Sequence, residues 1–228
     1  MLKDKLITIL IPAFNEEKNI ALVIKDTLKL SKKYPLEVIV VDDGSTDKTA
    51  IVAKVSGATK VISHKKNMGK GAAVKTGINH AQGDFIIQID SDYQFKPSEI
   101  PNFIQALNAG ANIVVGSRFK GNQIAKGSIK LTHIFGNAFL SLVTSVASGI
   151  KVTDIMAGFK GFQTKSAKKL DLQTNHFGYE AEIIVKAKKL NLKVSEIPIS
   201  YSKRKFGHSA VNTIRDGFKV IFTIIKSH

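Results

Sequence analysis

Short apolar segments rich in β-branched residues alternate with segments of helical periodicity along this chain, and this alternation constrains the fold more than any other feature. In the first half, strands are predicted at 6–11, 37–41, 59–63, 84–89 and 112–116. The segments between them predict helices at 16–31, 47–56, 69–81 and 97–109. Strands that alternate with helices pair in parallel, so the pattern predicts an α/β domain with a mostly parallel central sheet flanked by helices.

The second half has a less regular pattern, but no shift in composition marks a domain boundary. A polar, glycine-containing segment at 119–129 predicts a loop. Helices are predicted at 130–148, 177–190 and 210–225, extended segments at 157–162 and 192–201, and a basic loop at 203–209. We therefore expect residues 1–228 to form a single domain, which suits a chain of this length.

The net charge of +16 is concentrated in the second half of the chain. Residues 1–117 carry 15 basic and 12 acidic side chains, whereas residues 118–228 carry 19 and 6. Such a surface predicts an anionic partner: nucleic acid, lipid headgroups or a phosphorylated substrate. Only three of the 34 cationic residues are arginines, namely Arg118, Arg204 and Arg215. Because the guanidinium fork suits bidentate phosphate contacts, each arginine is a candidate phosphate ligand.

Composition also argues against several classes of protein. The chain has no cysteine, so it forms neither disulfides nor thiolate metal sites. Aromatic residues make up only 7%, and no nucleic-acid-binding motif is recognisable, which disfavours a nucleic-acid partner. No stretch reaches the ~20 apolar residues of a transmembrane helix. The predicted helix at 210–225 is amphipathic, and either lies at a membrane interface or closes the core.

An acidic triplet, Asp90-Ser91-Asp92, directly follows the predicted strand at 84–89. Two carboxylates one residue apart can hold a hard divalent cation whose coordination is completed by water and phosphate oxygens. Three further polar motifs also follow predicted strands, at 11–17, 41–47 and 67–73. Parallel strands place their carboxyl ends at one edge of the sheet, where ligands of α/β proteins bind. We therefore expect the four motifs to meet there.

In this order, the four motifs resemble those of the family 2 glycosyltransferases of GT-A fold. Within that family the chain looks most like the polyprenyl-phosphate branch, which includes the dolichol-phosphate mannose synthases. The resemblance covers nearly the whole chain and implies one Rossmann-like GT-A domain. Residues 1–117 would bind the nucleotide sugar and metal, and residues 118–228 would bind the acceptor and end in a basic amphipathic helix.

The resemblance also implies specific site residues. The nucleotide-sugar group comprises Pro12, Phe14, Glu16, Val41, Asp42, Asp43, Lys70, Asp90, Ser91 and Asp92. The metal group comprises Asp90, Asp92 and Gln94, with Mg²⁺ or Mn²⁺ as the cofactor. The group expected to contact the acceptor phosphate comprises Arg118, Lys130, His133, Arg204 and Ser209. Ala210 stands where the family has a lysine, which puts one phosphate contact in doubt.

The implied reaction is inverting, metal-dependent transfer of a hexose from GDP-mannose or UDP-glucose to a dolichyl or undecaprenyl phosphate. It would take place on the cytoplasmic face of a membrane, with the enzyme attached peripherally. The implied catalytic residues are Asp90, Asp92, Arg118, Asp154 and Arg204. An acceptor phosphate is already anionic and needs no general base. Asp154, Glu180 and Glu182 are then candidates to position the acceptor.

Two alternatives remain open from the sequence. A family 2 enzyme that acts on a soluble or saccharide acceptor would need a catalytic base, for which Asp154 and Glu180 are candidates. A basic nucleic-acid-binding protein is the remote alternative. The donor sugar, the prenyl type and the oligomeric state are not readable from the sequence.

Overall fold

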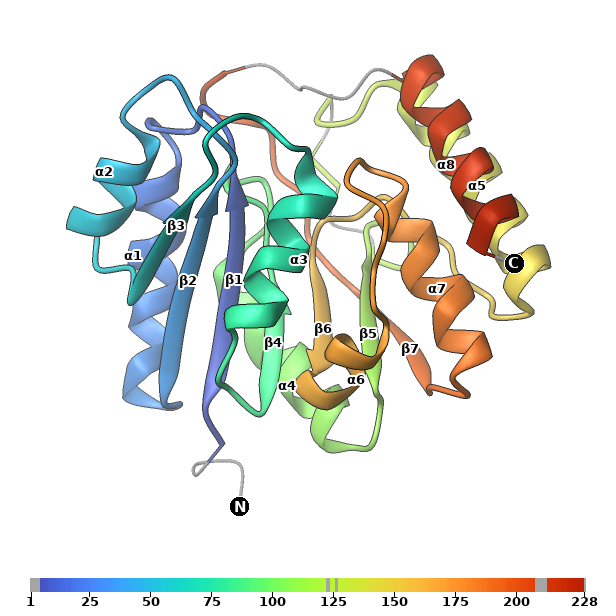
Figure 1. The fold of residues 1–228 in the computed structure, drawn as a ribbon, viewed down its shortest axis with the longest axis horizontal. Helices are drawn as coiled ribbons and strands as arrows, with labels where there is room; N and C mark the ends of the chain where they lie inside the picture. Colours follow the sequence, from blue (N-terminus) through green and yellow to red (C-terminus); the bar gives the residue numbers. More distant parts are fainter. Residues whose placement is uncertain (1–4, 122–123, 126, 208–212, 228) are drawn as a thin grey trace.

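The computed structural model describes residues 5–121, 124–125, 127–207 and 213–227. Within this part, seven strands form one sheet (Figure 1). They are β1 (Ile7–Ala13), β2 (Leu36–Asp42), β3 (Lys60–Ser63), β4 (Phe85–Gln88), β5 (Ile113–Ser117), β6 (Lys160–Gln163) and β7 (Val194–Pro198). Their order across the sheet is β3-β2-β1-β4-β6-β5-β7.

Every neighbouring pair of strands is parallel except the two pairs that β6 makes, with β4 and with β5. The mostly parallel sheet is therefore confirmed. Lys160 opens β6 and pairs with Gln88 and Val115, near the carboxyl ends of β4 and β5. Because β6 runs in reverse, the segment that precedes it lies at the same sheet edge as the acidic triplet.

Helices cover both faces of the sheet. One face carries α1 (Ile20–Leu28), α2 (Thr49–Val55) and α4 (Ile100–Asn108), with the 3₁₀ turns η2 (Lys29–Lys32) and η3 (Pro97–Glu99) beside them. The other face carries α3 (Lys70–His80), α5 (Leu131–Ser148), α6 (Thr164–Lys169), α7 (Tyr179–Lys189) and α8 (Thr213–Ser227). In Figure 1, α5 and α8 lie side by side at one end of the molecule, next to α7.

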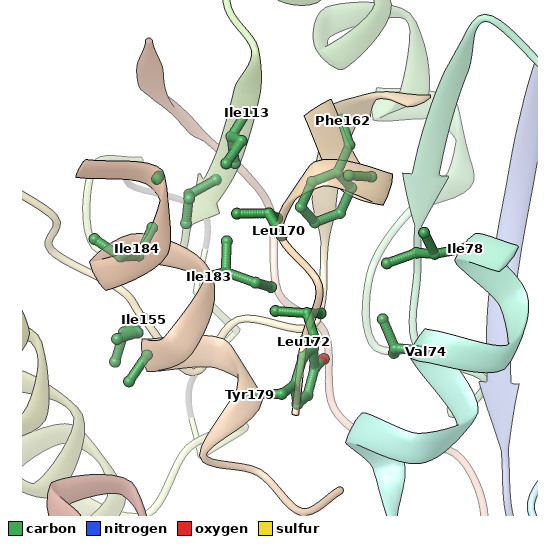
Figure 2. Packing of buried hydrophobic residues seen from close by; sticks show 14 of the residues in the cluster. Val74, Ile78, Ile113, Ile155, Phe162, Leu170, Leu172, Tyr179, Ile183 and Ile184 are labelled. Carbon is green, nitrogen blue, oxygen red and sulfur yellow. The ribbon is translucent and has the colours of Figure 1, made fainter. Parts of the chain in front are cut away.

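Two apolar cores result from this layering, one on each face of the sheet. Strand β1 shows why: Ile7, Ile9 and Ile11 belong to one core and Leu10 to the other, because successive side chains of a strand point to opposite faces. Figure 2 shows the second core around Leu172 of the loop before α7. Fully burying one such side chain contributes about 1.5–3 kcal/mol, so this packing fixes the sheet that carries the site.

The structure corrects several predicted boundaries. The helix expected at 16–31 begins only at Ile20, because Asn15 has a positive φ of 54° and leads into a turn. The strand expected at 157–162 is found at Lys160–Gln163. Helix α6 was not predicted, since its sequence, TKSAKK, has a single apolar residue and therefore no periodicity. The C-terminal helix is confirmed as Thr213–Ser227, and residues 210–212 lie outside the described residues.

Candidate active site

A cavity of about 610 Å³ lies at the carboxyl edge of the sheet. Loops that follow β1, β2, β4 and β5 contribute to its wall, together with the first turns of α3 and α5. The predicted site residues that line it are Pro12, Phe14, Glu16, Asp43, Lys70, Asp90, Ser91, Asp92, Gln94, Arg118, His133 and Arg204. The prediction that the strand-end motifs meet at one edge is therefore correct.

Five predicted residues are not among those that line this cavity in the described part of the chain. Val41 is fully buried in the core, and the Asp42 carboxylate accepts a hydrogen bond from Ser45 N at 3.2 Å. Lys130 is exposed at the N-terminal end of α5, and Asp154 is fully buried behind Arg118. Ser209, like Ala210, lies outside the described residues.

Asp90 lines the cavity beside the ammonium group of Lys70. The Lys70 Nζ–Asp90 Oδ1 distance is 2.8 Å. Burial acts to lower the pKa of Lys70, but the charge of Asp90, its hydrogen bond to the ammonium group, and the nearby Tyr179 and Asp92 together raise it. Gly158 packs against Asp90 so closely that a Cβ there would lie 2.1 Å from Asp90 Oδ2. Only glycine fits at this position, a constraint that the sequence did not reveal.

Asp92 and Glu16 both form an ion pair with Arg204. The Arg204 guanidinium donates to Asp92 Oδ2 and to Glu16 Oε1, each at 2.7 Å. Burial and the nearby Asp90 raise the pKa of Asp92 to about 6, although Arg204 opposes the shift. Tyr93 has a φ of 61°, and after this turn Gln94 N donates to Asp92 Oδ1 at 3.0 Å. The turn thus holds Asp92 and Gln94 at one wall of the cavity.

Arg118 and Asp154 form a buried ion pair. Arg118 Nε and Nη2 each donate to an oxygen of Asp154 at 2.7 Å, and Arg118 N donates to the same carboxylate at 2.9 Å. Burial acts to lower the pKa of the Arg118 guanidinium. The charge and hydrogen bonds of Asp154, with a smaller contribution from Tyr201, raise the pKa above its usual value. The guanidinium also lies 5.0 Å from the centre of the Tyr201 ring. With five N–H donors and two engaged by Asp154, Arg118 keeps donors for a phosphate.

A second buried ion pair, Lys160–Glu180, lies beneath the cavity and was not predicted. Both side chains are fully buried, and Lys160 Nζ also donates to the carbonyl of Ile155 at 3.2 Å. Glu180 in turn lies 3.4 Å from Lys70 Nζ and accepts a hydrogen bond from the Tyr179 hydroxyl at 2.9 Å. Glu180 is therefore a support for Lys70. The sequence did contain one signal of this pair: Lys160 stands within an otherwise apolar strand segment, where a charged side chain needs a buried partner.

Two further acidic side chains, those of Glu182 and Asp43, accept hydrogen bonds from backbone N–H groups. Glu182, predicted to position the acceptor, instead accepts from the backbone N–H groups of Gln173 and Thr174, at 2.7 and 2.9 Å. Asp43 lines the cavity, and its carboxylate accepts from Gly69 N at 2.8 Å and from Met68 N at 3.0 Å. Asp43 thus fixes the loop that leads into α3.

His133 lines the cavity from the first turn of α5. Burial, together with the positive charges of Lys130 and Arg118, lowers the pKa of the imidazole. His133 is therefore neutral at neutral pH and adds no positive charge to the cavity. It can still donate one hydrogen bond to a phosphate oxygen.

The residues at the cavity fit a hard divalent cation. The donors are the carboxylates of Asp90 and Asp92 with the amide of Gln94, and all three residues line the cavity. Asp90 Oδ1 is paired with Lys70 Nζ at 2.8 Å, and a carboxylate oxygen with one such contact keeps a lone pair for a metal. Among the described residues no three His, Cys, Asp or Glu side chains cluster. The remaining coordination would therefore come from water and substrate oxygens, as magnesium sites with few protein ligands require.

Comparisons with known proteins agree with this geometry. The family model for glycosyl transferase family 2 matches residues 8–171. The protein MJ1222 of Methanocaldococcus jannaschii is 36% identical over 98% of this chain and 92% of its own length. The UDP-N-acetylglucosamine–dolichyl-phosphate N-acetylglucosaminyltransferase of Methanococcus voltae is 32% identical over 97% of this chain and 96% of its own.

Solved structures show the same fold. The crystal structure of glucosyl-3-phosphoglycerate synthase from Mycobacterium tuberculosis, in complex with Mn²⁺ and UDP-glucose, matches with a TM-score of 0.77. The two sequences are 23% identical, and the match covers 98% of this chain and 79% of that one. At this identity the comparison shows the fold.

Proposed function

The chain belongs to glycosyl transferase family 2, and on that basis we propose that it transfers a hexose from a nucleoside diphosphate sugar to a polyprenyl phosphate at a membrane surface. The observation that carries the proposal is one cavity that brings together Asp90 and Asp92 with Lys70, Arg118 and Arg204. Carboxylates suit a metal-bound diphosphate, and the arginines suit a second phosphate group. The name of the Methanococcus voltae relative, which specifies dolichyl phosphate, supports this acceptor.

The cations in the cavity have separable roles in this reaction. Lys70 and the metal-binding carboxylates hold the donor diphosphate, and Arg118 and Arg204 hold the acceptor phosphate in line with the anomeric carbon. A divalent cation at Asp90 and Asp92 would stabilise the negative charge that develops on the departing diphosphate. The acceptor oxygen forms the new bond as the anomeric C–O bond breaks, so backside attack inverts the configuration.

The ionisation of the acceptor decides between the two glycosyltransferase alternatives. A hydroxyl acceptor needs a base, whereas a phosphate oxygen is already anionic near neutral pH. Asp154 and Glu180, the two candidate bases, are both fully buried and both engaged in ion pairs. This arrangement favours a phosphate acceptor. The cytoplasmic face of the membrane stays a prediction.

A transfer assay tests the proposed function directly. The purified protein would be incubated with Mn²⁺, radiolabelled UDP-glucose, GDP-mannose or UDP-N-acetylglucosamine, and polyprenyl phosphate in vesicles. We expect label in the lipid fraction with one donor, and a thermal shift with the same nucleotide because ligands that bind only the native state raise the Tm. Label that appears only on soluble sugars or phosphorylated small molecules would contradict the lipid acceptor and favour the soluble alternative.

Metal affinity should depend on pH through Asp92. Burial and Asp90 raise the pKa of Asp92 to about 6, so its carboxylate becomes protonated below that pH. A metal binds only the ionised form, and the affinity for Mn²⁺ in the presence of UDP should fall as the pH is lowered through about 6. Calorimetric titration at pH values below and above this pKa measures the change. Equal affinities on both sides would show that Asp92 is not a ligand.

Arg204→Ala should weaken use of the acceptor more than binding of the donor. Its guanidinium is the group expected to hold the acceptor phosphate, and lost orientation of this kind corresponds to roughly a hundredfold fall in kcat/KM for the lipid. Steady-state assays that vary the polyprenyl phosphate and the donor separately measure the two effects. Lys189→Ala is the control variant, because it removes one positive charge at an exposed position at the end of α7. Equal activity of Arg204→Ala and Lys189→Ala would show that Arg204 does not hold the acceptor phosphate.

A further inference from the structure

Helix α5 is amphipathic, but its polar side faces the protein and its apolar side faces outward. This is the reverse of the usual arrangement for a helix that packs on a protein core. Its buried side is mostly polar and consists of Asn137, Leu140, Ser141, Thr144 and Ser148. Its outer side carries large apolar residues that are 55–76% exposed: Leu131, Phe135, Phe139, Leu142 and Val146. At about 100° per residue these five fall within an arc of about 80°, roughly opposite the buried side. A water-facing helix would present the opposite arrangement.

Hydrogen bonds of the buried side fix this orientation. The Asn137 side chain donates to the carbonyl of Thr153 at 3.2 Å and accepts from Met156 N at 3.1 Å. Ser141 Oγ accepts from Ile155 N at 3.1 Å. Turning the helix to bury its apolar side would break these bonds and leave buried polar groups without partners. The apolar side is therefore directed outward by the fold.

Helix α8 also carries exposed apolar residues. Phe218, Phe222 and Ile225 are 68–70% exposed and lie on one side of α8, which packs beside α5 (Figure 1). We call the five outer residues of α5 and these three the α5–α8 apolar face. Exposed apolar patches of this kind mark interaction sites.

By length and composition alone, α5 could cross a membrane, with 18 residues and a mean hydropathy of 1.3. It still falls short of the ~20 apolar residues that a transmembrane helix needs. Its polar side bonds to residues 153–156, so α5 lies along the protein surface. An amphipathic helix held in this way suits the plane of a lipid interface.

Charge distinguishes a bilayer from a second copy of the chain. Helix α5 contains no Asp, Glu, Lys or Arg, but Lys130 precedes it, Lys151 follows it, and exposed Lys226 adjoins Ile225 on α8. This pattern, an apolar surface bordered by lysines, matches an anionic membrane surface. Two chains that each carry a net charge of +16 would instead repel each other.

The same two helices line the candidate active site. Residues of α5 and α8 that contact the cavity are His133, Gly136, Asn137, Leu140, Gly217 and Lys219. We infer that the α5–α8 apolar face inserts into the interface of an anionic bilayer, so that the cavity opens at the level of the lipid phosphates. Docking at this face rests on the surface alone, whereas delivery of a lipid acceptor rests on the proposed function.

Vesicle flotation tests the docking. The double variant Phe135→Ser/Phe139→Ser removes two aromatic rings from the α5–α8 apolar face, and Ile51→Ser/Val55→Ser removes two comparably exposed apolar residues from α2. With vesicles of equal parts phosphatidylcholine and phosphatidylglycerol, we expect wild type and the α2 variant to float. The α5 variant should bind at least tenfold more weakly. Equal flotation of the two variants would overturn the inference.

A fluorescence measurement locates the inserted residues without relying on loss of binding. The chain has no tryptophan, so Phe139→Trp and Ile51→Trp are each single-tryptophan probes. On addition of the same vesicles, we expect a blue shift and quenching by brominated lipid for the probe on α5. The probe on α2 should not change. A probe on α5 that stays in water while the protein floats would overturn the inference.

Two further readouts separate docking from its alternatives. If light scattering shows a dimer that Phe135→Ser/Phe139→Ser dissociates without any change in flotation, the face binds a second copy and the inference is wrong. Thermal shift with UDP and Mn²⁺ reports the donor site, and it should be equal in wild type and the α5 variant. A protein that floats through this face but transfers no sugar to lipid would retain the docking and refute the proposed function.

Discussion

Asp92→Asn should reduce sugar transfer by roughly a thousandfold or more, the largest effect expected of any single substitution here. The amide cannot supply the second anionic ligand of the metal, so the charge on the departing diphosphate loses its stabilisation. The change should not unfold the protein. Burial and Asp90 raise the pKa of Asp92 to about 6, so the ionised carboxylate costs the folded state free energy at neutral pH, and Arg204 keeps Glu16 as a partner.

Transfer rates with saturating Mn²⁺ and the Tm of each protein measure the two expectations together. Asp171→Asn is the matched control, because it makes the same chemical change at an exposed position away from the cavity. Asn also tolerates the positive φ of 44° at that position. Loss of transfer with an unchanged or higher Tm would support the metal role. Wild-type transfer by Asp92→Asn would end it.

Asp154→Ala should be strongly destabilising. The fully buried carboxylate accepts three hydrogen bonds from Arg118, and its removal leaves a buried guanidinium without its counter-charge. Breaking a buried pair in this way costs about 3–5 kcal/mol. For a chain of this size the Tm should fall by roughly 6–20 °C. Chemical denaturation and thermal melting measure the change.

A double substitution separates stability from function at this pair. Arg118→Met/Asp154→Leu replaces both charges with apolar groups, which is often neutral or stabilising for buried pairs. We expect it to regain most of the stability that Asp154→Ala loses, while transfer to the lipid remains low because Arg118 is the proposed phosphate ligand. If the double variant were as unstable as Asp154→Ala, then the loss of packing, not the unpaired charge, would explain the effect. If it were fully active, Arg118 would not hold the phosphate.

The strand-end motifs could be placed from the sequence because their arrangement follows from a general rule. Parallel strands bring their carboxyl ends to one edge, so Lys70, Asp90 and Asp92 had to lie near one another once the strands were recognised. Arg118 and Arg204, which line the cavity, stood out because arginine is rare in this chain. Local pattern and composition were sufficient for these residues.

The position of the predicted residues that do not line the cavity depends on side-chain direction and on distant partners. Val41 and Asp42 precede Asp43 by two positions and by one, and only the folded chain shows that Asp43 is the one of the three that lines the cavity. Glu180 looked like a candidate acceptor contact, but the reversal of β6 brings Lys160 beneath it. No periodicity in the sequence encodes that reversal.

The sequence by itself determined the α/β class, the order of most elements and the edge of the sheet at which the acidic and basic groups meet. These features depend on local periodicity and on the carboxyl-end rule for parallel strands. Only the tertiary structure decided the pairings, such as Arg204 with Glu16, which lie 188 residues apart, and the outward direction of the apolar side of α5. A periodic pattern shows that a helix has two sides, but the packing of the whole chain determines which side meets the core.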